Sequence, residues 1–211
     1  MKTLLFDFDG TLVDSRDIVV QIYNGIADKY SYRKIDSSDI STLSKISITE
    51  RCKFLNVPTY KIPLLVYEAM KIYKDYILDI NILEEMKDVL SELKKEELNL
   101  VIVSSNSKST IKAILQRNKV DIFNYIYSSK NLFGKHFTID TFIKKHNIKR
   151  EEVIYIGDEQ RDIISCKKCG IKIISVTWGY DSSDLLLAHK PDYIVNKPIE
   201  IIDIVKFFKK E

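Results

Sequence analysis

FDFDGTLVDS, residues 6–15, follows a short apolar run near the start of this 211-residue chain. Asp7 and Asp9 stand one residue apart at the end of a predicted strand over residues 3–8, so their side chains lie on the same face. Two carboxylates this close repel each other unless a cation or a proton joins them. Alone, the Asp-x-Asp-Gly pattern is also typical of a tight turn. The stretch therefore predicts a strand that ends either in a turn or in a site for a cation.

The overall composition is that of an ordinary folded protein. The chain is 45% hydrophobic and 30% charged, and 33 Lys and Arg nearly balance 30 Asp and Glu. Its basic residues lie in short scattered runs, which indicates solvated helix faces and not a nucleic-acid surface. No apolar window has the length of a membrane span, and the first residues do not resemble a signal peptide. We expect a cytoplasmic protein, monomeric or homodimeric, that binds neither nucleic acid nor membrane.

Two of the three cysteines, Cys166 and Cys169, stand three residues apart near the end of a predicted helix. A zinc site needs two further ligands, and a reactive thiol pair is favoured at the start of a helix. We therefore expect both side chains to be buried as small apolar groups.

Apolar runs alternate with helical patterns along most of the chain. Leu100–Val103 and Ile173–Val176 are β-branched without polar alternation, which is typical of strands buried on both faces of a parallel sheet. The alternation predicts an α/β fold, a Rossmann-like three-layer α/β/α core around a parallel sheet. The predicted strands are 3–8, 98–103, 125–127, 153–156, 172–176 and 193–195, and the predicted helices are 86–95, 109–118, 138–145, 162–169 and 199–208.

A helical block interrupts this alternation after the first strand. Residues 15–83 contain helical patterns and no convincing strand. We predict that 15–83 forms a helical cap domain, inserted into an α/β core domain made of 1–14 and 84–211. The first helix of the block is indicated by the spacing of Val19, Ile22, Tyr23, Ile26 and Tyr30, and shorter helices are expected at 38–46, 48–55 and 64–78.

Polar residues follow the predicted strands at the edge where open α/β sheets bind ligands. Carboxylates that meet at such an edge need a cation, and hard oxygen donors without His or Cys favour Mg²⁺. The sequence therefore predicts a magnesium site beside polar groups, which is a site for a phosphate. The residues concerned are Asp7, Asp9, Gly10 and Thr11 after the first strand, Ser104, Ser105 and Asn106 after the second, and Asp158, Glu159 and Asp162 after the third.

The two aspartates of the opening stretch divide the chemistry of phosphate transfer between them. Asp7 can attack phosphorus and form an aspartyl-phosphate, which splits one difficult hydrolysis into two steps. Asp9 can protonate the leaving oxygen and then deprotonate the attacking water. Ser104 can donate a hydrogen bond to the phosphoryl group while a lysine supplies charge, although a helix cap is the alternative role for Ser104.

DFDGTLVDS, VIVSSN and YIGDEQRDI, in this order, resemble motifs one, two and four of the haloacid dehalogenase superfamily, and more narrowly its phosphoglycolate phosphatase-like branch. The resemblance spans the core to about residue 196, while the cap matches in position and helical character only. It implies that Asp7 is the nucleophile and Asp9 the acid and base. It also implies that Asp7, the backbone carbonyl of Asp9, and Asp158 bind Mg²⁺, with Asp162 completing the acidic motif.

The motif-three lysine is the least regular part of this resemblance. The branch usually has a lysine followed by prolines before a helix, whereas Gly134-Lys135-His136-Phe137 contains no proline. We choose Lys135, because a lysine beside a flexible glycine approaches a phosphate freely, and Lys130 is the competitor. The remaining strand-end residues are expected to bind the substrate; they are Gly10, Thr11, Ser105 and Asn106.

The expected function is Mg²⁺-dependent hydrolysis of a small phosphorylated metabolite, such as a phosphoglycolate-like monoester. The acid at position 9 favours phosphoryl chemistry over dehalogenation. A sugar phosphomutase, a pyrophosphatase, a phosphonate hydrolase and a non-catalytic phosphate-binding protein stay open. A phosphonate hydrolase would need a cap lysine, and the cap holds Lys29, Lys34, Lys45 and Lys53. The candidate cap contacts to the substrate are Ser15, Arg16 and Tyr23.

Overall fold

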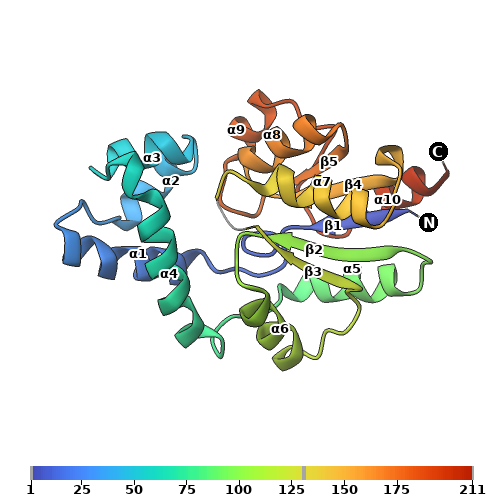
Figure 1. Ribbon diagram of the computed structural model, residues 1–211, viewed down its shortest axis with the longest axis horizontal. Helices are drawn as coiled ribbons and strands as arrows, with labels where there is room; N and C mark the ends of the chain where they lie inside the picture. The colour runs from blue at the N-terminus through green and yellow to red at the C-terminus, as the bar shows by residue number, and fades with distance from the viewer. Residues whose placement is uncertain (1, 130–131, 211) are drawn as a thin grey trace.

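The computed structural model describes residues 2–129 and 132–210. Within these residues, six parallel strands form one sheet in the order β3-β2-β1-β4-β5-β6 (Figure 1). The α/β prediction is therefore confirmed, with β1 at the centre, between β2 and β4. The strands are β1 (Thr3–Phe6), β2 (Asn99–Ser104), β3 (Tyr125–Ser128), β4 (Val153–Gly157), β5 (Lys172–Val176) and β6 (Tyr193–Val195).

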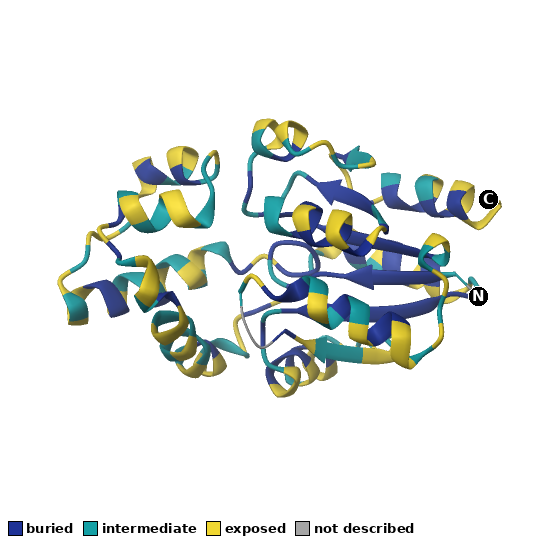
Figure 2. Cartoon of the chain, turned by 45° about the horizontal axis from the view of Figure 1, so that its top comes forward, coloured by how far each residue is buried: buried dark blue, intermediate teal, exposed yellow. Residues whose placement is uncertain are grey.

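Helices cover both faces of the sheet, and the inner strands are buried between them (Figure 2). Side chains alternate along β1, so Leu4 and Phe6 pack toward α5, α6 and α10, whereas Leu5 packs toward α7 and α8. Cys166 and Cys169 carry buried free thiols in the second of these layers, as predicted. The helices are α5 (Glu84–Lys94), α6 (Lys108–Arg117), α7 (Lys135–Lys145), α8 (Gln160–Cys169), α9 (Ser183–Ala188) and α10 (Glu200–Lys210).

The helical insertion, residues 15–83, lies beside the sheet at one end and not on either face (Figure 1). It has a small apolar cluster of its own around Leu43, Leu55 and Val57, while Ile22 and Tyr73 join the cluster that continues into the core. Its helices are α1 (Arg16–Tyr30), α2 (Ile40–Leu43), α3 (Ile48–Phe54) and α4 (Ile62–Tyr73), with short 3₁₀ turns at Ser37–Asp39, Thr59–Lys61 and Lys74–Tyr76.

Two predicted helices of the insertion differ from the structure. The helix expected at 38–46 is a 3₁₀ turn followed by one α-helical turn, α2. The helix expected at 64–78 begins at Ile62, because Pro63 occupies its first turn, where a missing N–H costs no hydrogen bond. It ends at Tyr73, where the chain tightens into the 3₁₀ turn that follows.

The first strand ends at Phe6 instead of the predicted Phe8. The backbone N–H of Asp7 still donates to Ile156 O at 2.9 Å, but that of Phe8 donates to the Asp7 carboxylate at 2.7 Å. The chain then turns through Gly10, whose φ of +80° is readily reached only without a Cβ. The opening stretch thus forms a tight turn, and the turn presents the two aspartates beyond the sheet.

No helix in residues 2–129 and 132–210 combines the length and the apolar character needed to cross a lipid bilayer. The cytoplasmic location stays a prediction.

Candidate active site

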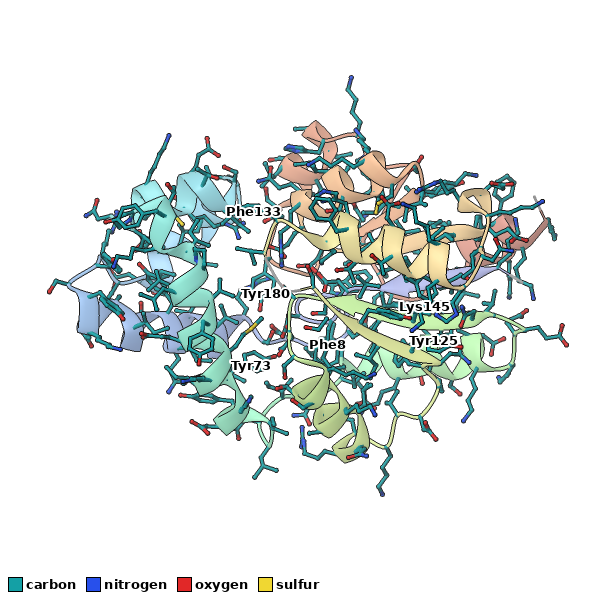
Figure 3. All side chains as sticks on the ribbon, viewed as in Figure 1. Phe8, Tyr73, Tyr125, Phe133, Lys145 and Tyr180 are labelled. Carbon is teal, nitrogen blue, oxygen red and sulfur yellow. The ribbon has the colours of Figure 1, made fainter. Side chains whose placement is uncertain are left out.

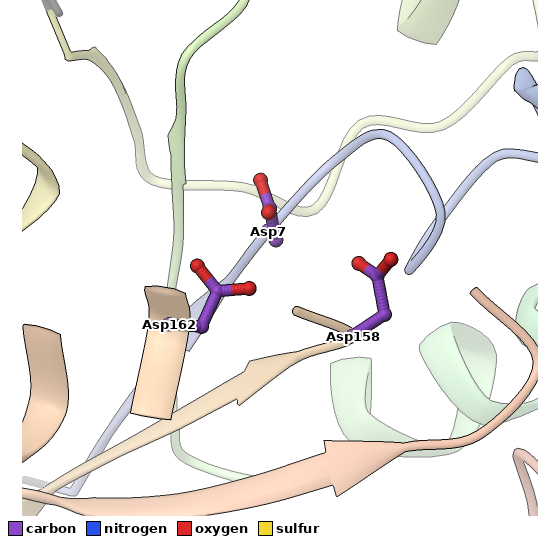
Figure 4. Close-up of side chains that lie close together, drawn as sticks. All are labelled: Asp7, Asp158 and Asp162. Atoms are coloured by element: carbon purple, nitrogen blue, oxygen red, sulfur yellow. The ribbon is translucent and has the colours of Figure 1, made fainter. Parts of the chain in front are cut away.

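Three buried aspartates of the described chain converge at the carboxyl ends of β1 and β4 (Figure 4). Asp7 follows β1, Asp158 follows β4, and Asp162 lies in the first turn of α8. One carboxylate oxygen from each lies within 4.8 Å of the others, and none of the three residues is more than 2% exposed. The sheet topology brings these acids together, because the carboxyl ends of neighbouring parallel strands share one edge.

Lys135, at the start of α7, supplies positive charge to this cluster. Its Nζ lies 2.6 Å from Asp7 Oδ2 and 2.5 Å from Asp162 Oδ1. Burial pushes the pKa of Lys135 down, but the Asp162 and Asp7 carboxylates raise it by more, so its pKa lies above the ordinary value. The lysine is therefore a buried cation between two of the acids. The competing Lys130 lies outside the described residues.

Asp158 is held in a fixed orientation by its neighbours. Its Oδ1 accepts from Thr11 Oγ1 at 2.7 Å, and its Oδ2 accepts from the backbone N–H of Tyr180 at 2.8 Å. A Cβ on Gly10 would lie 2.3 Å from Asp158 Oδ2, and one on Gly179 would lie 2.2 Å from Asp158 Cβ. Both glycines therefore make the room in which this carboxylate sits.

The charge at this cluster fits a divalent metal ion. One lysine against three carboxylates leaves negative charge without a partner. Burial and repulsion from Asp7 raise the pKa of Asp162 to about 7, and burial together with neighbouring carboxylates raises that of Asp158 well above its usual range. A bound dication would keep both acids ionised. The side-chain donors are all carboxylate oxygens, which suit Mg²⁺.

Asp9 faces the helical insertion and takes no part in the cluster of three. Its Oδ1 accepts from Ser15 Oγ at 2.8 Å and from the hydroxyl of Tyr73, and its Oδ2 accepts from Asn106 Nδ2 at 3.1 Å. Burial raises the pKa of Asp9 by more than these three donors lower it, and Asp7 adds a smaller repulsion. Asp9 therefore holds a proton more readily than an exposed aspartate.

Ser104, the last residue of β2, lies at the same carboxyl edge of the sheet. Ser104 is buried, and its Oγ accepts from the backbone N–H of Asn106 at 3.1 Å. It does not cap α6, because that helix is capped by Ser107, whose Oγ accepts from Thr110 N at 3.1 Å. The alternative role of Ser104 as a helix cap is therefore wrong.

The buried Glu159 and the partly exposed Arg161 form an ion pair that was not predicted from the sequence. Arg161 Nε lies 2.6 Å from Glu159 Oε2, and its Nη1 donates to Leu132 O at 3.0 Å. Burial raises the pKa of Glu159, but Arg161 outweighs that effect, so the pKa is lowered. Glu159 is thus paired with Arg161 and not directed to the acidic cluster. The signal was present, since both residues stand in the GDEQRD stretch beside the two predicted ligands.

A cavity of about 310 Å³ separates the sheet edge from the insertion. Asp7, Asp9, Ser105 and Asn106 line it from the sheet side, and helices α1 and α4 line it from the other. Figure 3 shows Tyr73 and Tyr180 in the region between the two. The cavity thus places two predicted substrate-binding residues and both aspartates of the opening stretch around one space.

Other predicted contacts lie next to this cavity without lining it. Thr11 donates its hydroxyl to Asp158, and Ser15 donates to Asp9, so both act on aspartates instead of the open space. Arg16 donates to the backbone carbonyl of Trp178 at 3.2 Å. Of the three candidate cap contacts, only Tyr23 belongs to the lining among the described residues.

The insertion touches the core at a second place, away from β1. Arg51 of α3 forms an ion pair with Asp181, whose other carboxylate oxygen accepts from Gln160 N at 2.6 Å. Beside it, Ser182 N donates to Ser44 O at 2.8 Å. Together with the Tyr73–Asp9 hydrogen bond, these contacts hold the insertion over the site.

A Rossmann-like sheet with an acidic edge and a helical insertion after its first strand defines a class of α/β enzymes. Residues 4–176 match the family model of haloacid dehalogenase-like hydrolases. The chain therefore belongs to the haloacid dehalogenase-like hydrolases, and the resemblance seen in its three motifs is confirmed.

Named relatives cover nearly the whole chain. A phosphoglycolate phosphatase from Synechococcus elongatus is 29% identical over 206 residues, which are 97% of either chain. The pyrophosphatase PpaX of Bacillus mycoides is 22% identical over 218 residues, also 97% of either chain. The crystal structure of a predicted phosphatase from Clostridium acetobutylicum superposes with a TM-score of 0.82 at 26% identity and covers 97% of both chains.

Proposed function

We propose that this protein is a Mg²⁺-dependent phosphatase that hydrolyses a small phosphomonoester through an aspartyl-phosphate. One observation carries the proposal: Asp7, ion-paired to Lys135 in the acidic cluster, and Asp9, held apart from it, border the same cavity. A nucleophile must stay ionised and a proton donor must not, so the separate surroundings of the two acids suit two separate roles. Two relatives of similar length, a phosphoglycolate phosphatase and a pyrophosphatase, support phosphate chemistry.

The first step transfers the phosphoryl group to Asp7. A carboxylate oxygen of Asp7 attacks phosphorus, the bond from phosphorus to the leaving oxygen breaks, and Asp9 gives its proton to that oxygen. Lys135 stabilises the equatorial phosphoryl oxygens, since its Nζ already lies 2.6 Å from Asp7 Oδ2. Ser104 donates a hydrogen bond to the same group. The turn at Gly10 and the cavity-lining Ser105 and Asn106 are the further phosphate contacts expected, whereas Thr11 acts through its hydrogen bond to Asp158.

The second step hydrolyses the aspartyl-phosphate and regenerates the free enzyme. Asp9, now ionised, takes a proton from a water molecule, which attacks phosphorus and releases inorganic phosphate from Asp7. Ser15, Tyr73 and Asn106 hold the Asp9 carboxylate in position through both steps. The raised pKa of Asp9 suits this double use, because the acid must hold a proton before the first step and release it during that step.

Asp7, Asp158, Asp162 and the backbone carbonyl of Asp9 are the residues that would hold Mg²⁺. Bound there, the ion would neutralise the phosphate and the carboxylates, which lets a carboxylate approach a phosphate of the same sign. We further propose that residues 15–83 act as a cap domain on a core made of 1–14 and 84–211. Closure of such a cap excludes water from the reacting groups.

The alternative of a phosphonate hydrolase has little support in the geometry. Its chemistry needs a lysine that reaches the substrate, and no lysine appears among the described residues that line the cavity. Lys29 lies 3.0 Å from Glu68, and Lys34 lies 2.7 Å from Asp28, so both are engaged elsewhere.

Phosphate release from a panel of phosphorylated metabolites tests the proposal. We expect turnover that requires Mg²⁺, is abolished by EDTA, and falls at least about a thousandfold in Asp7→Asn. Asp14→Asn is the matched control, because Asp14 is exposed in the same stretch and bonds only the nearby Arg16 N–H in the contacts observed. Phosphate binding without release, or full activity of Asp7→Asn, would refute the proposal and favour a binding protein.

A further inference from the structure

The side of the cavity formed by the insertion is lined mostly by apolar side chains. Helices α1 and α4 pack side by side and turn apolar side chains toward the sheet edge, at spacings of three and four residues that share one helix face. This apolar wall includes Val19, Ile22 and Ile26 of α1 and Leu65, Val66 and Met70 of α4.

The polar groups that the insertion brings to the cavity are already engaged. The hydroxyl of Tyr23 donates to Arg33 O at 2.9 Å, and that of Tyr73 donates to Asp9. The guanidinium of Arg51 is paired with Asp181, and its Nε donates to Leu43 O at 2.8 Å. A substrate group that enters this side therefore meets side chains whose donors have protein partners.

Among the described residues, the sheet side offers no better partner for a second anionic group. Arg161 lines the cavity, but its guanidinium already pairs with Glu159 and donates a hydrogen bond to Leu132 O. Among the described lining residues, the cations are therefore the two arginines just named, and each already faces a buried carboxylate. The carboxylate of a phosphoglycolate, or the second phosphate of a pyrophosphate, would have to compete with Glu159 or Asp181 for its counter-ion.

We infer that the organic group of the substrate is apolar: the enzyme acts on monophosphates of alkyl or aryl alcohols that carry no second charge. This inference rests on the proposed phosphatase function and specifies its substrate class. The cavity is continuous with Asp7 and Asp9, so a phosphate at the sheet edge directs its ester group onto the apolar wall. Its volume of about 310 Å³ suits a small ligand.

Two ester series measured with Mg²⁺ on the full chain test this inference. The first contains n-alkyl phosphates from methyl to hexyl, and the second contains alkyl phosphates of matched length that end in a carboxylate, beginning with phosphoglycolate. Each buried methylene should raise kcat/KM about fourfold until the wall is covered. The carboxylates should be hydrolysed at least about tenfold less efficiently than alkyl esters of equal length, because the charge is desolvated without a free partner.

Two variants test whether the apolar wall causes the rise of kcat/KM with alkyl chain length. Met70→Gln keeps the size of a side chain on the apolar wall but adds an amide, and it should flatten the rise of kcat/KM with chain length. Leu64→Gln, on an exposed position of the same helix outside the lining, should keep the rise.

Three outcomes decide between the inference and its failure. A rise with alkyl length that Met70→Gln flattens supports it. Equal or better hydrolysis of the carboxylate series would overturn it while the phosphatase function stands. If no ester of either series releases phosphate, both the proposed phosphatase function and this inference are refuted.

Discussion

The carboxyl edge of the sheet and the helical insertion face each other across one cavity but differ in what they bring to it. The sheet edge contributes charge: three buried carboxylates, a buried lysine and an arginine–glutamate pair. The insertion contributes mostly apolar side chains. Its tyrosines and its arginine are exceptions, and their polar groups form hydrogen bonds or an ion pair within the protein. Charge held rigidly at strand ends suits a reaction common to many substrates, and an apolar wall on a separate helical block suits the choice among them.

Among the changes that compare the two regions, removal of the cation from the sheet edge should have the largest effect. In Lys135→Met, Asp7 and Asp162 lose their buried partner, so activity should fall about a hundredfold to a thousandfold. Breaking such a pair should also lower the free energy of unfolding by about 3–5 kcal/mol without Mg²⁺. Urea unfolding and kcat/KM measure the two effects. Lys144→Met, at an exposed position of the same helix, should change neither, and unaltered kinetics in Lys135→Met would mean that the sheet edge does not act as described.

Loss of the proton carrier should come next and should depend on the substrate. Asp9→Asn cannot protonate the leaving oxygen, so kcat should fall about a hundredfold or more for alkyl esters. For an ester with an acidic leaving group, such as p-nitrophenyl phosphate, the first step needs less help and the loss should be smaller. Steady-state kinetics on both esters checks the difference. Equal losses would argue against Asp9 as the acid.

The Tyr73–Asp9 hydrogen bond links the two regions and should have an intermediate effect. Tyr73→Phe keeps the ring on the insertion side and removes the hydroxyl, so kcat should fall about tenfold, as expected for one hydrogen bond to a charged group. The pH profile of kcat should shift as well, since Asp9 loses a donor that lowers its pKa. Tyr67→Phe, exposed on the same helix, is the control. An unchanged pH profile would mean that the insertion does not tune the acid.

The second contact of the insertion is the ion pair between Arg51 and Asp181. Removal of the Asp181 carboxylate should have the smallest effect, a change in how the free energy of unfolding depends on pH. Burial and repulsion from Glu159 raise the pKa of Asp181 to about 6 from an ordinary 3.8, although Arg51 lowers it in part. The folded state then binds the proton more tightly than the unfolded state, so this group makes stability fall as pH rises from about 4 to 6. Asp181→Asn should remove that part of the slope in chemical unfolding at several pH values. A slope equal to that of the wild type would contradict the assignment.

Much of the sheet edge could be predicted from sequence because its signals are local. Asp7 and Asp9 stand in one turn, and Asp158 and Asp162 stand at the start of one helix, so strand order alone brings the two pairs together. Lys135 was chosen as the motif-three lysine from the resemblance and from the glycine beside it, but its ion pair with Asp7 was not predicted. The fold class followed from the same alternation of strands and helices.

The insertion was predicted only in outline because its interactions join distant parts of the chain. Tyr73 reaches Asp9 across 64 residues, and Arg51 reaches Asp181 across 130. No local pattern distinguishes such a tyrosine from one that merely packs. The apolar residues of α1 and α4 have the periodicity of a helix face, but the same periodicity describes a buried core and a cavity wall. The short helix α9 was missed altogether, since six residues carry too little periodicity.

Covalent labelling of Asp7 tests the central claim most directly. The enzyme with Mg²⁺ would be mixed with a radiolabelled phosphomonoester and quenched in acid within one turnover, and its peptides would be analysed for label. The account predicts label on the peptide that contains Asp7, lost in Asp7→Asn and prolonged in Asp9→Asn, whose water attack is slowed. Rapid turnover by the wild type with no covalent label at any quench time, or label on a different residue, would contradict it.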